Sequence, residues 1–117
     1  MRALILYGET VSETSSFAQV AEAHAEGRNF WLELDERSDE ATAFLETTLG
    51  IHPLAIEDVW NDVSLPKVED YDAYVQIIIH GIREDDQSSK DVPLELAELD
   101  LIIGENFLVT HARDEKI

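Results

Sequence analysis

The sequence predicts an α/β fold with a mixed parallel and antiparallel sheet and helices on both faces. Apolar and turn-forming residues give the order strand, helix, strand, helix, helix, and then a run of strands. The three isoleucines at 77–79 are apolar on both sides of a strand, which is typical of a central strand covered by helices on both faces. The length of 117 residues fits one domain, residues 1–117.

Two strands are predicted in the first third of the chain. Residues 3–7 (ALILY) form a short apolar run that Gly8 ends. Residues 29–35 (NFWLELD) alternate between apolar and polar side chains, which predicts a strand with one buried face.

Two helices are predicted beside these strands. The first, around residues 17–24, has candidate N-cap residues within 12–16 and ends at Gly27. The second, around residues 41–49, follows a Ser-Asp cap and ends at Gly50.

A third helix is predicted over residues 53–63. His52 can cap it, and Pro53 suits the first turn because its missing N–H would be unpaired there. Pro66 ends the helix at or before Leu65. At 100° per residue one face is apolar and should pack on the core. Its members are Ile56, Val59, Trp60 and Val63.

The opposite face of this helix is acidic. Asp58 and Asp62 share the exposed side by helix geometry, and Glu57 lies on the flank. Carboxylates are ligands for hard divalent cations such as Mg2+, so this face is a candidate cation site; a solvated helix face is the alternative. Lys67 and Arg83 are expected to pair with some of the many carboxylates.

The second half of the chain is predicted to be mainly strands. A short extended piece covers 67–71, and longer strands cover 74–82, 94–103 and 107–111, with the last three in an antiparallel meander. Residues 83–91 read as a polar loop, 104–106 as a hairpin turn, and 112–117 as a polar tail.

The charge balance limits the partners of the chain. Twenty-six Asp and Glu face eight Lys and Arg, for a formal net charge of −18. Such a charge repels nucleic acid and anionic lipid, and favours cations and basic proteins. The chain has no cysteine, which excludes disulfides and thiolate metal sites. Its apolar runs are too short for a signal peptide or a membrane helix.

The sequence carries no enzyme signature. It lacks a glycine-rich phosphate loop, a GxSxG elbow and the HExxH spacing of a metal site, so we expect no enzyme. The histidines are spread over separate elements and are expected to be caps or core groups. They are His24, His52, His80 and His111.

Several blocks of residues recur in a known family in this order and at similar spacing. They are 30–34 (FWLEL), 52–59 (HPLAIEDV), 66–69 (PKVE), 74–75 (YV) and 106–110 (NFLVT). Together they resemble the N-terminal cytosolic domain of the CorA family of divalent-cation transporters, from about residue 29 onward.

The resemblance implies a function and a site. CorA-like proteins are homopentamers whose cytosolic domains form a funnel on the cytoplasmic face of the cell membrane, leading to membrane helices. Cations bound by acidic residues between neighbouring domains favour the closed state. Carried over, Asp58 would bind a regulatory cation and Glu57 would serve an adjacent site, whereas Asp62 is a candidate on geometry alone. The implied cation is weakly bound Mg2+, with Co2+, Ni2+ and Zn2+ as other options.

The sequence also departs from the family pattern. Leu65 stands where the family usually has arginine, and the Gly-Met-Asn pore signature and membrane spans are not in the chain. We therefore expect a soluble cytosolic fragment of a transporter of the Mg2+/Co2+ class, which does not insert into the membrane itself. The alternatives are a ZntB-type zinc transporter domain and a free-standing acidic module that binds a basic protein.

Overall fold

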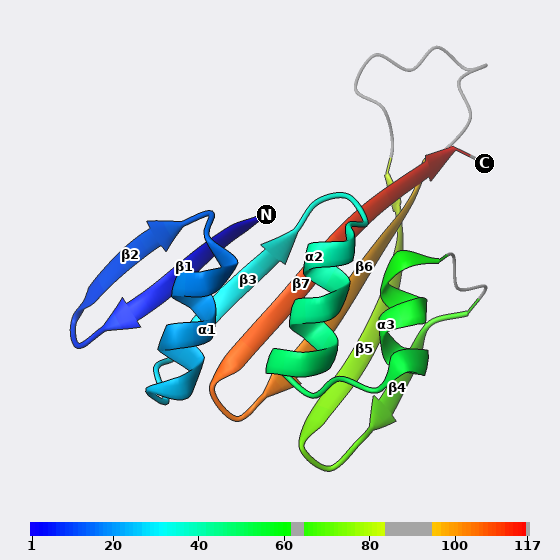
Figure 1. Cartoon of the computed structure of the whole chain (residues 1–117). Helices are drawn as coiled ribbons and strands as arrows, with labels where there is room; N and C mark the ends of the chain where they lie inside the picture. The colour runs from blue at the N-terminus through cyan, green and yellow to red at the C-terminus, as the bar shows by residue number, and fades with distance from the viewer. Residues whose placement is uncertain (62–64, 84–94, 117) are drawn as a thin grey trace.

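The computed structural model of the chain describes residues 1–61, 65–83 and 95–116 (Figure 1). In chain order its elements are β1 (Arg2–Tyr7), β2 (Thr10–Thr14), α1 (Phe17–Ala25), β3 (Phe30–Leu34), α2 (Asp39–Ala43) continuing as the π-helical segment η1 (Phe44–Thr48), α3 (Pro53–Trp60), β4 (Lys67–Asp70), β5 (Tyr74–Arg83), β6 (Glu95–Gly104) and β7 (Phe107–Lys116).

The described strands form one sheet in the order β2-β1-β3-β7-β6-β5-β4. Strands β3 and β7 pair in parallel, with Leu32 opposite Val109, and the other neighbouring pairs are antiparallel. Strands β5, β6 and β7 form the predicted meander, and a short turn joins β6 to β7. The prediction of a mixed sheet is confirmed.

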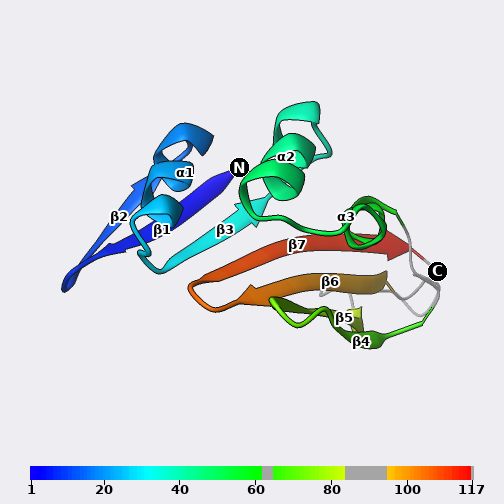
Figure 2. The ribbon, with the colours of Figure 1, turned by 60° about the horizontal axis from the view of Figure 1, so that its bottom comes forward.

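The described helices cover one face of this sheet, on which α1, α2 and α3 all lie (Figure 2). The two sides of β5 show the difference: the side chain of Ile78 is 1% exposed, whereas Ile79, which points to the other face, is 47% exposed. Helices were expected on both faces, and for the described residues that expectation is wrong. An apolar run shows that both sides of a strand are apolar, but not what covers each side.

The core lies between the helices and the sheet, and the ends of the first two helical segments were predicted correctly. The Ser16 hydroxyl accepts a hydrogen bond from the Gln19 N–H, and the Ser38 hydroxyl accepts one from the Ala41 N–H. Gly27 and Gly50, which follow the first two helical segments, have φ of 72° and 68°, a conformation that favours glycine. No helix in the described ranges is long and apolar enough to cross a membrane.

One strand and two element boundaries differ from the predictions. Strand β2 was not predicted, and β7 continues to Lys116 where a polar tail was expected. Helix α3 ends at Trp60 because Asn61 is extended, with φ −106° and ψ 156°. Val63 and the loop at 84–91 lie outside the described residues.

Candidate cation site

Helix α3 begins at a well-defined cap. His52 Nδ1 accepts a hydrogen bond from the Leu54 N–H at 3.1 Å, and Pro53 occupies the first turn, as predicted. The backbone N–H of His52 donates to the Tyr74 hydroxyl at 2.8 Å. This contact ties the start of the helix to strand β5.

The apolar face of α3 is buried against the core, as the helical projection predicted for Ile56, Val59 and Trp60. Two side-chain hydrogen bonds add to this packing. Trp60 Nε1 donates to Thr42 Oγ1 at 3.0 Å, and the buried Gln76 side chain donates to the Ala55 carbonyl at 3.1 Å. The packing and hydrogen bonds hold α3 against both the α2 region and the sheet.

Asp58 lies in the last turn of α3 and is half-buried. Its Oδ2 lies 2.5 Å from Lys67 Nζ, and the same ammonium lies 3.3 Å from Glu69 Oε2. The hydrogen bond from Asp58 is the main cause of a raised pKa at Lys67, and Glu69 acts in the same direction while burial opposes them. The expectation that Lys67 pairs with a carboxylate is confirmed, but Asp58 is less exposed than the projection predicted.

The other predicted acids are not assembled around Asp58. Glu57 is exposed on the neighbouring position of α3, and Asp62 lies outside the described residues. Among the side chains that the structure describes, no group of three or more His, Asp or Glu is placed to hold a metal ion. Asp58 and Glu57 are therefore separate carboxylates in the described part of this chain.

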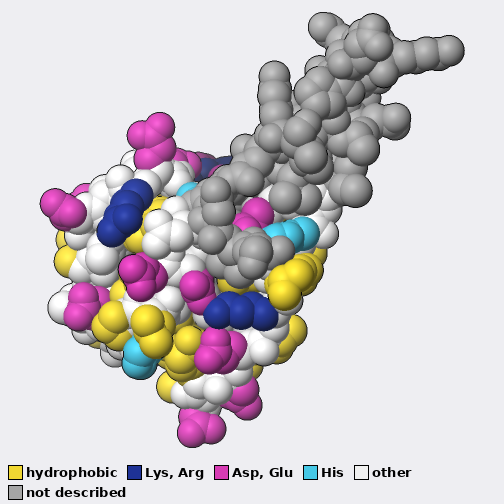
Figure 3. All heavy atoms as spheres, turned by 90° about the vertical axis from the view of Figure 1, so that its right-hand side faces the viewer, with side chains coloured by type: hydrophobic (Ala, Val, Ile, Leu, Met, Phe, Trp, Pro, Cys, Tyr) yellow, Lys and Arg dark blue, Asp and Glu magenta, His cyan; other side chains and the backbone are white. Residues whose placement is uncertain are grey.

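Aromatic rings border the site at the turn between β4 and β5. The Tyr71 ring stacks on Tyr74 and on His52, with centroid distances of 4.8 Å and 6.0 Å. Burial raises the pKa of the Tyr71 phenol, and Glu69 adds to the shift. Figure 3 shows this side of the molecule, on which Asp and Glu side chains are spread out and outnumber Lys and Arg, with hydrophobic side chains between them.

A buried polar row under the helices was not predicted as a group. His80 Nε2 lies 3.0 Å from Glu98 Oε1, and His111 Nδ1 lies 3.5 Å from Asp100 Oδ2. The Trp60 and His111 rings also pack in a T-shaped arrangement, with 5.2 Å between their centroids. Because side chains alternate along a strand, the sequence of β6 places Glu98 and Asp100 on one face, and this pattern could have predicted that they lie together. The expectation that histidines are caps or core groups is confirmed at His52, His80 and His111.

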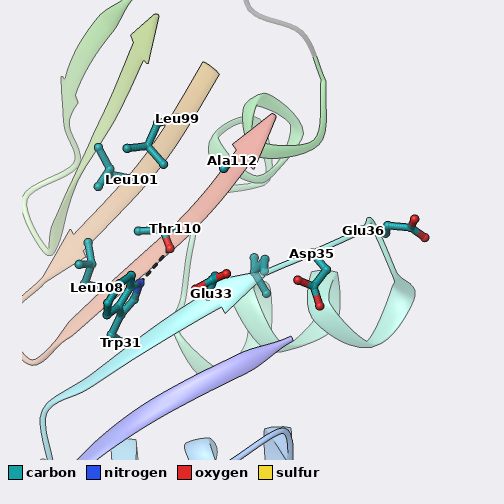
Figure 4. A pocket seen from close by; sticks show the side chains of 10 residues that line it. Trp31, Glu33, Asp35, Glu36, Leu99, Leu101, Leu108, Thr110 and Ala112 are labelled. Carbon is teal, nitrogen blue, oxygen red and sulfur yellow. Dashed lines mark hydrogen bonds between the residues drawn. The ribbon is translucent and has the colours of Figure 1, made fainter. Parts of the chain in front are cut away.

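The opposite face of the sheet carries a groove of about 650 Å3, which contains none of the predicted site residues. Leu99, Leu101 and Leu108 form its apolar floor, and Trp31 donates a hydrogen bond from Nε1 to Thr110 Oγ1 at 2.8 Å (Figure 4). Acidic residues of β3 and the segment after it form its rim. They are Glu33, Asp35 and Glu36.

A comparison with known protein families shows which family the chain belongs to. The family described as CorA-like Mg2+ transporter protein matches residues 26–116, which is more than half of the chain. The chain belongs to this CorA-like family. Over 81 residues it is also 35% identical to YfjQ of Bacillus subtilis, which is named as a metal ion transporter. That match covers 69% of this chain and 23% of YfjQ.

Solved structures agree with the family in fold. The soluble domain of CorA from Methanocaldococcus jannaschii has a TM-score of 0.62 at 16% identity, over 93% of this chain and 39% of that chain. The cytoplasmic domain of ZntB from Vibrio parahaemolyticus has a TM-score of 0.64 at 14% identity, over 96% of this chain and 43% of that chain. The present chain thus spans less than half of each of these relatives.

Proposed function

We propose that this chain is the cytosolic regulatory part of a CorA-like transporter of the Mg2+/Co2+ class, and that Asp58 and Glu57 help to sense divalent cations. The observation that carries the proposal is the placement of Asp58. Its carboxylate sits on a firmly packed helix and already accepts a positively charged group at 2.5 Å.

The position of Asp58 favours a cation for a second reason. The last turn of a helix carries a partial negative charge, which adds to the charge of the carboxylate. Mg2+ keeps several of its waters and takes one or two protein carboxylates, so a single chain would supply only part of its shell. A neighbouring subunit of a homopentamer would supply the rest.

This arrangement would couple cation level to gating. Acidic groups on adjoining subunits repel one another until a cation bridges them. When the cytoplasmic cation concentration falls, the cation bridges are lost, and the closed state is no longer stabilised relative to the open state. The function is therefore transport control at the cytoplasmic face of the membrane, without catalysis.

Isothermal titration of Mg2+ and Co2+ into the chain tests the proposal. We expect weak binding, with a dissociation constant on the order of 0.1–1 mM or higher, because few carboxylates are available in one chain. Asp58→Ala should abolish most of it. Glu22→Ala, which removes an exposed acid from α1, is the charge-matched control and should bind as the wild type does. Equal binding by Asp58→Ala would remove Asp58 from the site.

A ZntB-type zinc function is the second candidate, because the fold is similar to a ZntB cytoplasmic domain as well. A parallel titration with Zn2+ separates the two. The Mg2+/Co2+ proposal expects no Asp58-dependent preference for Zn2+, whereas an Asp58-dependent site that binds Zn2+ much more tightly than Mg2+ would favour the zinc function.

A further inference from the structure

A basic side chain, Lys67, already occupies the position where Asp58 would meet a cation. Its ammonium contacts Asp58 at 2.5 Å and Glu69 at 3.3 Å. The side chains of Lys67 and Asp58 are 34% and 29% exposed, so water shields this pair only in part. The Arg2–Glu13 ion pair, by contrast, has both side chains more than half exposed.

The backbone fixes Lys67 in this place. Strand β4 pairs with β5 so that Lys67 stands opposite the buried Ile78, on the face of the sheet that carries the helices. Because side chains alternate along a strand, Glu69 points to the same face and Val68 to the other. Lys67 and Glu69 are thus both directed towards α3, where Asp58 lies.

We propose that Lys67 is a tethered competitor, which pairs with Asp58 until a divalent cation displaces it. The inference rests on the proposed function and adds the residue that sets the divalent-cation concentration at which Asp58 is occupied. On displacement, Asp58 exchanges one ammonium for a metal ion or one of its bound waters. The released ammonium keeps Glu69 as its acceptor, so it is not left unpaired.

This exchange would discriminate by charge. A monovalent cation carries the same charge as the ammonium and gains nothing in Coulomb energy by replacing it, whereas a divalent cation brings twice the charge. The tether also gives the ammonium a high local concentration that free ions lack. Lys67 would therefore shield the site from K+ and Na+ and raise the divalent concentration needed for occupancy.

The competing explanation is that Lys67 only joins α3 to β4. Lys67→Met separates the two, because it keeps most of the aliphatic stem and removes the charge. A purely structural role predicts a shift of the urea midpoint with unchanged cation affinity. The competitor role predicts tighter cation binding, with Asp58 required for the gain.

The test is a Mg2+ titration of the 117-residue chain at fixed ionic strength, followed by amide chemical shifts. We expect Lys67→Met to bind Mg2+ roughly two- to fivefold more tightly, from the usual strength of a partly exposed ion pair. Lys67→Arg should stay near the wild type. Arg2→Met removes the same charge from the Arg2–Glu13 pair and should have no such effect. Lys67→Met/Asp58→Asn should lose the gain.

The outcomes separate the two proposals. If the wild type and Lys67→Met bind Mg2+ equally well and both depend on Asp58, the competitor role is overturned and the proposed function stands. If binding to neither chain depends on Asp58, the proposed function falls and the competitor role falls with it. A gain that Arg2→Met reproduces would be a net-charge effect and would also overturn the role of Lys67.

Discussion

The chemistry of the site is concentrated in one carboxylate with an unusual set of neighbours. Asp58 combines partial burial, the negative end of α3 and an ammonium partner, Lys67. Partial burial and the negative helix end both destabilise an unpaired negative charge on Asp58, and the ammonium of Lys67 offsets this effect. On the proposed function, the same balance would let a divalent cation replace Lys67 at Asp58.

Tyr71 gives a prediction at the residue scale. Burial and Glu69 raise the pKa of its phenol in the folded chain above the ordinary value of about 10. Its contribution to stability is therefore fully present below about pH 10 and is lost as the pH rises through the folded pKa. Urea unfolding between about pH 8 and pH 11 should show a smaller alkaline loss in Tyr71→Phe than in the wild type. Equal losses would show that Tyr71 does not carry the effect.

Sequence patterns led to Asp58 but not to its partner. The HPLAIEDV block and the helical projection singled out the residue. Which basic group reaches Asp58 depends on the path of the chain between α3 and β4, and no periodic pattern specifies that path. The buried row of Glu98 and Asp100 was missed for a similar reason, because alternation groups residues on a face without showing which face is covered.

Helix α3 was predictable as an element because its signals are local and agree. A cap, a proline in the first turn and one apolar face all indicate the same helix. Strand β2 (TVSET) and the polar end of β7 carry no such signals. They are strands because their neighbours, β1 and β6, supply their hydrogen bonds.

Two residues of α3 provide a test at the element scale. Ile56 is buried in the core, whereas the nearby Leu54 is exposed. Ile56→Ala should lower the free energy of unfolding by about 2–5 kcal/mol, because it leaves a cavity. Leu54→Ala should change it by no more than about 0.5 kcal/mol. Urea unfolding followed by circular dichroism measures both, and similar effects of the two substitutions would contradict the packing of α3.

In the described part of the chain, helices cover only one face of the sheet. Its helices and core lie on one face, and the other face presents an apolar groove with an acidic rim (Figures 2 and 4). The apolar pattern of β5 was predicted correctly, but the inference that helices cover both of its sides was not. The net charge of −18 favours cations over anions near the surface, which agrees with the proposed function.

The two tryptophans report on this asymmetry. Trp31 on the open face is 42% exposed, whereas Trp60 on the core-facing side of α3 is 7% exposed. Acrylamide should quench the fluorescence of Trp60→Phe, which retains Trp31, several-fold more strongly than that of Trp31→Phe. Equal quenching of the two variants would contradict the one-sided core.

The central claim is that Asp58 binds a divalent cation in exchange for Lys67, and carboxyl carbon NMR tests it most directly. The side-chain signal of Asp58 is followed as Mg2+ is added at constant ionic strength, with the exposed Glu22 as an internal reference. We predict that the Asp58 signal moves with a saturable dependence on Mg2+, together with the signal of the Lys67 ammonium, while Glu22 stays near its starting position. An Asp58 signal that stays fixed, or that moves only as much as Glu22 does, would contradict the account.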